Sequence, residues 1–279
     1  MVNWAQNLYR FLRVLSLDVV AGALVGALFF AYHFKVQLPW PVLTALGLAI
    51  WLIYTLDHLA DARHTGHTAH TYRHRFHQKY ARWLWLGVVV AALGGMAMLW
   101  LLPAPTLRLG ATVAAVAIVY FIANTLFKSA FAHVKELSGA LIYSAGVLTG
   151  PLSLLPAWPA TAYFYFAQLT LIALANLLIF AWYEVKSDAA DGHNSLVQHL
   201  GPEKSKRLIS SILALALACT ISGLFVLGKP AQLAQGLLLV MTVALTATFA
   251  FGSYFGQAER YRILGDAIFY LPAIYLVLL

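Results

Sequence analysis

Long apolar runs separated by short polar links make up most of the chain. Each run is about as long as the roughly 20 residues that an α-helix needs to cross a bilayer. Proline residues stand in several of the links, where they end one helix and begin the next. The pattern predicts an all-α, polytopic membrane protein with a single domain, residues 1–279, and nine transmembrane helices. These are expected near 14–34, 40–58, 83–102, 106–127, 137–157, 162–183, 208–227, 231–251 and 263–279.

Composition agrees with this class of protein. Apolar residues account for 62% of the chain, charged residues for only 10%, and the mean hydropathy is +0.78. A soluble domain has about 25% charged residues, because its surface must be solvated by water. The single cysteine, Cys219, excludes a disulfide framework within the chain and a cysteine-based metal site.

The basic residues are distributed unevenly over the links and predict an orientation. Fifteen of the eighteen stand at the N-terminus or in every second link, and only Lys35, Arg108 and Lys229 stand in the others. Positively charged links stay in the cytoplasm, so we expect the N-terminus and the long loops there and the C-terminus outside. The net charge of +8 is thus attributed to topology, and no nucleic-acid partner is expected. We expect a multi-pass protein of the cell (inner) membrane.

Two polar segments, Asp57–Lys79 and Glu184–Gly201, interrupt the apolar pattern. Each begins at the end of an apolar run with two carboxylates four residues apart, Asp57 with Asp61 and Glu184 with Asp188. Residues at this spacing share one face of a helix, so the two carboxylates repel each other unless a cation lies between them. In the predicted orientation both pairs lie at cytoplasmic helix ends, where the helix dipole also disfavours negative charge. A divalent metal that carries a diphosphate removes this conflict. The simpler alternative is that these acids pair with Arg63 and Lys186.

The two segments resemble the acidic motifs of the UbiA superfamily of intramembrane prenyltransferases. The stretch EVKSDAADGHNSLVQHLG is similar to the family pattern DxxxDxxxGxxTLxxxxG, with Gly192 and Gly201 at its two glycines. The stretch DHLAD matches the last two acids of the family's first motif, NDxxDxxxD, and YRHR resembles its downstream arginine segment. This chain departs from the family pattern at two places: Ile53 and Tyr54 stand where the first motif opens with Asn-Asp, and Glu184 stands where the second begins with Asp.

The resemblance implies an activity and a set of site residues. Members of this family have nine transmembrane helices around a central cavity, and they transfer an isoprenyl group from an isoprenyl diphosphate to a lipophilic, often aromatic, acceptor. Mg²⁺ held by the two acidic motifs binds the diphosphate. Carried onto this chain, the catalytic residues are Asp57, Asp61, Glu184 and Asp188. The metal site comprises the same four with Asp191, and the diphosphate-binding cations are Arg73, Arg75, Lys128 and Lys186.

Two other classes of function remain open from the residues. The missing Asn-Asp is also compatible with a UbiA-derived protein that binds a lipid or a pigment precursor without prenyl transfer. His64, His67, His70, His74 and His77 recur every three or four residues and, on a helix, form one stripe that suits a transition metal. Such a stripe is compatible with a metal-dependent membrane oxidase. The blander interpretation is a basic loop that faces anionic lipid headgroups or a diphosphate.

Overall fold

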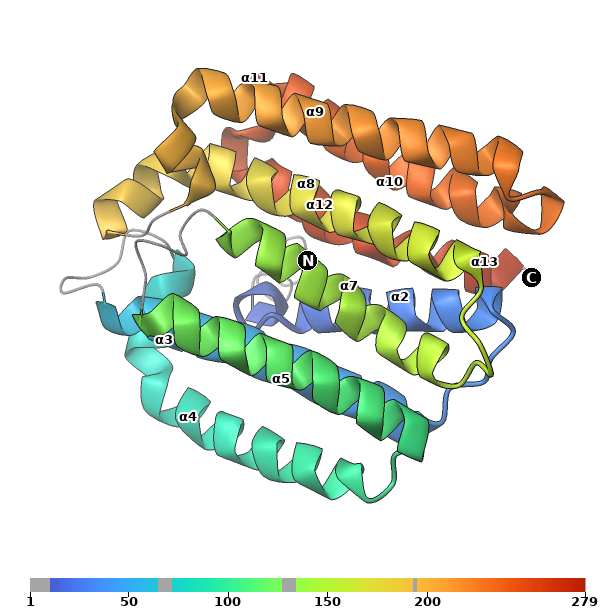
Figure 1. Ribbon diagram of the computed structural model, residues 1–279. Coiled ribbons are helices and arrows are strands. Elements are labelled where there is room, and N and C mark those ends of the chain that lie inside the picture. The colour runs from blue at the N-terminus through green and yellow to red at the C-terminus, as the bar shows by residue number, and fades with distance from the viewer. Residues whose placement is uncertain (1–10, 65–71, 127–133, 193–194, 279) are drawn as a thin grey trace, which may run out of the picture.

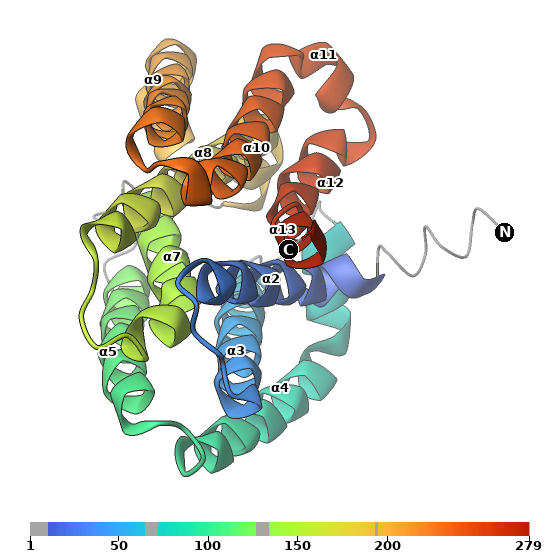
Figure 2. The same cartoon turned by 90° about the vertical axis from the view of Figure 1, so that its right-hand side faces the viewer.

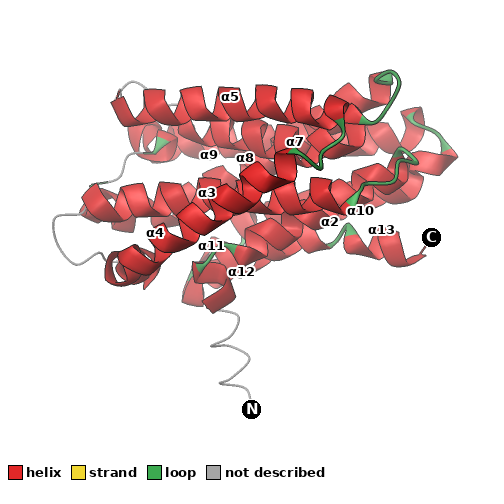
Figure 3. Cartoon of the chain, turned by 90° about the horizontal axis from the view of Figure 1, so that it is seen from below, coloured by secondary structure: helices red, strands yellow, loops and turns green. Residues whose placement is uncertain are grey.

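The protein is described by a computed structural model that covers residues 11–64, 72–126, 134–192 and 195–278. All regular structure in these ranges is helical (Figure 1, Figure 3). The main helices are α2 (Leu17–His33), α3 (Trp40–His64), α4 (Tyr72–Leu99), α5 (Ala104–Leu126), α7 (Lys135–Ser153), α8 (Ala160–Asp191), α9 (Leu196–Val226), α10 (Gln232–Ala250), α11 (Gly252–Phe255), α12 (Arg260–Ala267) and α13 (Ala273–Leu278). Short 3₁₀ turns η1 (Lys229–Ala231), η2 (Gln257–Glu259) and η3 (Ile268–Tyr270) join the last of them.

Every expected apolar run overlaps a helix, but several helices extend beyond the runs. The segment after Asp57 continues α3 to His64, α8 continues to Asp191, and α9 begins at Leu196 rather than near 208. Hydropathy marks where a helix leaves the apolar environment, whereas the helix itself continues until its backbone hydrogen bonding is interrupted. The last expected run, 263–279, is divided into α12, η3 and α13 instead of being one helix.

Seven segments of the described chain are long and apolar enough to cross a membrane. They include α3, α4, α5, α8, α9, α10 and the composite segment Gln257–Leu278. Helix α2 is apolar but shorter, and α7 carries a proline, Pro151, inside its last turn. The protein is therefore a helical membrane protein, while nine crossings and the orientation of the termini stay predictions.

The helices stand side by side with their axes roughly aligned (Figure 1), and the view along those axes shows how they surround the interior (Figure 2). Helix α2 contacts α3 and α7, α7 contacts α5 and α8, and α9 and α10 pack beyond α8. The main core lies between α2, α7, α8 and α10, where Phe30, Val147 and Ile172 are almost fully buried. On the other side, α3, α4 and α5 border a large cavity rather than a packed core.

Candidate functional site

A cavity of about 1310 Å³ runs along α3. Its wall includes residues of α2, α3, α4, α5, α7, α8 and α12. Val42 near the beginning of α3 and Asp61 near its end both line it. Since a helix rises about 1.5 Å per residue, the cavity extends over roughly 28 Å, close to the thickness of a bilayer core. Most of the wall is apolar, and the charged residues gather toward the end where Asp57 lies.

The first acidic motif faces a lysine from another helix. Asp57 and Asp61 both line the cavity, and the Lys135 Nζ lies 4.0 Å from Asp57 Oδ1 and 3.9 Å from Asp61 Oδ2. Lys135 is the first residue of α7. The Asp57 carboxylate raises the pKa of Lys135 above its ordinary value, so this side chain carries a full positive charge. The cation expected between the two carboxylates is thus present in the protein itself.

Glu136, the next residue, joins α7 to the beginning of α9. Its Oε1 accepts a hydrogen bond from the backbone N–H of Leu196 at 3.1 Å. Its Oε2 is buried and has no hydrogen-bond partner among the described residues. Burial raises the pKa of Glu136 above its ordinary value. The side chain also lines the cavity, and nothing in the sequence pattern marked it as a site residue.

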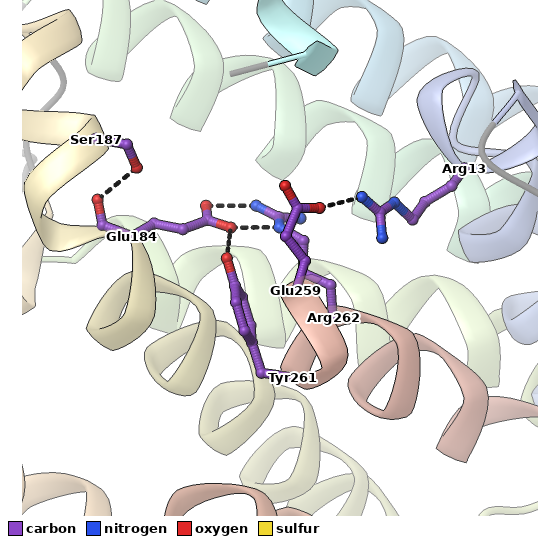
Figure 4. Close-up of polar contacts among 6 residues, drawn as sticks. All are labelled: Arg13, Glu184, Ser187, Glu259, Tyr261 and Arg262. Carbon is purple, nitrogen blue, oxygen red and sulfur yellow. Dashed lines mark hydrogen bonds and ion pairs between the residues drawn. The ribbon is translucent and has the colours of Figure 1, made fainter. Parts of the chain in front are cut away.

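The second acidic motif is held by α12 (Figure 4). Glu184 of α8 accepts hydrogen bonds from Arg262 at both of its oxygens, and the Tyr261 hydroxyl donates to Glu184 Oε1 at 2.8 Å. Beside this group, Glu259 forms an ion pair with Arg13. The Arg262 and Glu184 side chains are only 14% and 11% exposed, so each charge depends on its partner for compensation.

Backbone geometry explains the glycines of the second motif. Gly192 ends α8 with a φ of 74°, in the left-handed region that glycine adopts without steric cost. Gly201 interrupts α9 with a φ of 73°. Between them, Ser195 caps the beginning of α9, and its hydroxyl accepts a hydrogen bond from the N–H of Gln198. These turns keep the end of α8 and the beginning of α9 at the mouth of the cavity, where Asp188 and Ser195 both line the wall.

The remaining expected residues are distributed unevenly around the cavity. Arg75 lines it, whereas Lys186 is exposed and lies outside its lining. Asp191 is buried and also lies outside the lining. The side chain of Arg73 and the whole of Lys128 lie outside the described part of the chain. Of the histidine stripe, only the side chain of His77 is described. It is buried and packs edge-on against the ring of His58, with ring centroids 5.1 Å apart.

The cavity lining is strongly ionic at its polar end. The lining acids are Asp18, Asp57, Asp61, Glu136, Glu184, Asp188, Glu259 and Asp266. The lining lysines and arginines are Arg13, Arg75, Lys135 and Arg262. Because acids outnumber these bases, a polyvalent anion needs added positive charge in order to bind here. Within the described ranges, no three His, Cys, Asp or Glu side chains are grouped so that they hold a metal ion unaided.

Lys135, Glu136, Tyr261 and Arg262 are the site residues that the sequence pattern missed. Lys135 and Arg262 contributed there only to the count of basic residues in the links. One local signal was available for both: a basic residue near the beginning of a helix opposes the helix dipole and needs another reason to be there.

The fold and the position of the cavity define a class, a helical membrane protein with the UbiA-type arrangement of helices. No protein-family model matches the chain, and no curated protein matches its sequence. Among solved structures, the apo structure of a UbiA homolog from Aeropyrum pernix K1 matches with a TM-score of 0.68. The match covers 94% of this chain and 98% of that one, at 18% sequence identity. The resemblance to the UbiA superfamily is confirmed at the level of the fold.

Proposed function

We propose that this chain is an integral-membrane prenyltransferase that moves an isoprenyl group from an isoprenyl diphosphate to an aromatic or other lipophilic acceptor. One observation carries the proposal: the acids of both motifs and four basic side chains line the polar end of an apolar cavity that extends over most of α3. Small-molecule pockets usually have volumes of about 300–1,000 Å³. A cavity of about 1310 Å³ accommodates a long apolar chain together with an acceptor.

The donor set of the site fits Mg²⁺. A magnesium ion is satisfied by one or two carboxylates, with waters and phosphate oxygens at its other positions. Asp57 and Asp61 from α3 and Glu184 and Asp188 from α8 line the cavity at its acid-rich end and would hold it. The excess of carboxylates is also what makes a diphosphate, alone, a poor ligand for this surface. When bound, Mg²⁺ supplies Lewis-acid stabilisation of the leaving diphosphate.

The chain's own residues provide the remaining functions. In the proposed reaction the bond between C1 of the donor and the diphosphate oxygen breaks, and the electron pair leaves with the diphosphate. Lys135, Arg262 and Arg75 stabilise the negative charge that develops there. Tyr54 and Tyr143 are among the aromatic residues that line the cavity, and an aromatic ring beside the reacting carbon would stabilise an allylic cation. The acceptor then forms a bond to C1 and releases one proton, so the products are the prenylated acceptor and free diphosphate.

Neutralising the acids tests the proposal. Asp61→Asn and Asp188→Asn keep the side-chain volume and remove one charge each. Each single change is expected to abolish most turnover, and the double change to cost little more, because residues that act as one unit are strongly non-additive. Turnover is measured by mass spectrometry of prenylated lipids, and binding by the melting temperature with Mg²⁺ and diphosphate. Retention of the Mg²⁺-diphosphate stabilisation in both variants would place the site elsewhere.

A second candidate function has one observation in its favour. Ile53 and Tyr54, which replace the Asn-Asp of the first motif, line the cavity, so its wall is less acidic than the family pattern implies. A protein that binds a lipid or pigment precursor without transferring it needs no Mg²⁺-diphosphate. Tight binding of a lipophile that does not depend on Mg²⁺, together with no response to Mg²⁺ and diphosphate, would favour this second function.

A further inference from the structure

Each acidic motif is contacted by a basic side chain that comes from another helix. Lys135 of α7 lies between Asp57 and Asp61, about 4 Å from each. Arg262 of α12 binds both oxygens of Glu184. The two motifs lie on different helices, α3 and α8, and the two cations also come from different helices, so the arrangement occurs twice independently.

The helices that carry these cations do not account for them. Lys135 is the first residue of α7, and Arg262 is the third residue of α12. The beginning of a helix carries partial positive charge, which disfavours a cation there. The opposing carboxylates supply the compensating interaction. Both basic residues also line the cavity into which a diphosphate would enter.

The same carboxylates cannot serve a divalent cation and a resident cation equally well. Two positive charges a few ångströms apart repel each other, and the repulsion is strong in a partly desolvated site. A metal ion that takes the carboxylates therefore deprives Lys135 and Arg262 of their partners. A buried charge without a partner is costly, most of all for Arg262, whose side chain is 14% exposed. A diphosphate that arrives with the metal offers both side chains new anionic partners.

We propose that Lys135 and Arg262 are exchange cations: each neutralises an acidic motif in the free protein, and both pass to the diphosphate when a divalent cation takes the carboxylates. The exchange rests on the proposed diphosphate-dependent function, and it makes Lys135 and Arg262 the residues that couple the binding of Mg²⁺ to the binding of diphosphate. It follows that Mg²⁺ alone and diphosphate alone bind weakly, whereas each strengthens binding of the other. A coupling of the usual size changes affinity about 5- to 150-fold.

The test compares Lys135→Gln and Arg262→Gln with the wild type. Melting temperature and equilibrium binding are measured with EDTA, with Mg²⁺ alone, with inorganic diphosphate alone and with both. The wild type is expected to respond mainly to the combination. Each glutamine variant is expected to have a lower melting temperature than the wild type in EDTA. Mg²⁺ alone is expected to restore that melting temperature, and the affinity of the variant for Mg²⁺ should be at least about 5-fold higher than that of the wild type. The variant is also expected to bind Mg²⁺-diphosphate more weakly than the wild type does. Lys135→Arg and Arg262→Lys, which keep the charge, are expected to behave like the wild type toward Mg²⁺ alone.

Matched controls come from α9, where Lys204 and Arg207 are exposed. Lys204→Gln and Arg207→Gln are expected to leave all four responses unchanged. If Lys135→Gln gains no affinity for Mg²⁺ alone, the exchange is overturned. If that variant does not fold, the charge-balanced double variant Lys135→Gln with Asp61→Asn decides. It must bind Mg²⁺-diphosphate more weakly than Asp61→Asn does, and equal binding overturns the transfer of Lys135 to the diphosphate.

Failure of the exchange and failure of the proposed function give different results. If Mg²⁺ with inorganic diphosphate changes neither the melting temperature nor the binding signal of the wild type, the proposed function is contradicted. The gain of Mg²⁺ affinity in the glutamine variants does not depend on diphosphate and tests the competition between cations by itself.

Discussion

Glu136 shows how one residue links the site to the fold. One oxygen receives the N–H of Leu196, a donor at the beginning of α9 that has no partner within that helix. The other oxygen is buried without a hydrogen-bond partner among the described residues. Burial without full hydrogen bonding disfavours the ionised form, which is the cause of the raised pKa. The residue therefore connects α7 to α9 at some cost in stability near neutral pH.

Glu136→Gln is expected to remove this cost, because the amide oxygen still accepts from Leu196 and no buried charge remains. At neutral pH we expect the melting temperature to rise by about 2 °C, which corresponds to roughly 1 kcal/mol. Glu136 binds a proton more tightly in the folded protein than in the unfolded chain, because its pKa is raised on folding. The wild type therefore loses stability as the pH rises through the folded pKa.

The advantage of Glu136→Gln should accordingly disappear below the ordinary pKa of a glutamate. Thermal melts between pH 4 and pH 8 measure it, with Glu203→Gln as a control because Glu203 is exposed on α9. A benefit that is independent of pH, or that is shared by the control, would contradict the burial argument.

At the scale of elements, α12 is placed by its contact with α8. A side chain at Gly265 would put its Cβ 2.4 Å from Asn176 Oδ1 and 2.5 Å from Phe180 Cε1, so only glycine allows this approach. The same helix presents Tyr261 and Arg262 to Glu184. Close packing of α12 on α8 is thus a condition for the second acidic motif to meet its cation.

Gly265→Ala is expected to push α12 away from α8 and to lower the free energy of unfolding by about 1–3 kcal/mol. The response to Mg²⁺ alone should increase at the same time, because Arg262 moves away from Glu184. Gly95→Ala is the matched control, since no atom lies within 4 Å of the Cβ that it adds. It should leave stability unchanged or raise it by up to ~1 kcal/mol through helix propensity. Equal effects of the two substitutions on the melting temperature would refute this packing argument.

At the scale of the whole molecule, the ends of α3 and α8 place both acidic motifs at the same end of one cavity. The predicted orientation puts this end in the cytoplasm, where soluble diphosphates and Mg²⁺ are available. The apolar remainder of the cavity extends toward the opposite end, where Leu38 and Leu102 line it. An amphipathic donor with a charged head and a long apolar tail has the same division of polarity.

Cysteine labelling tests this orientation. In a Cys219→Ala background, Lys204→Cys lies beyond the start of α9, near the acidic motifs, and Lys229→Cys lies in the turn between α9 and α10. Both lysines are exposed. A membrane-impermeant thiol reagent added to whole cells should modify only Lys229→Cys, and it should reach Lys204→Cys only after the membrane is opened. The reverse result would invert the topology and place the acidic mouth outside the cell.

The hydropathy pattern was sufficient for the class of protein and for the position of its helices, because burial in lipid requires long apolar runs whatever their partners are. The paired acids and the glycines of the second motif were also visible in the sequence, since spacing along one helix and left-handed turns are local properties. The ends of the helices were not, because a helix continues past the edge of the apolar run, as α3 and α8 do.

Only the tertiary structure decided which charges meet. Asp57 and Lys135 are brought together by the packing of α7 near α3, and Glu184 meets Arg262 through the approach of α12 to α8. The sequence pattern offered only neighbours along the chain as partners: Lys186, which is exposed, and Arg63, whose side chain lies outside the described part of the chain. An ion pair depends on distance in space, and contacts between helices far apart in the sequence follow from packing that no local pattern specifies.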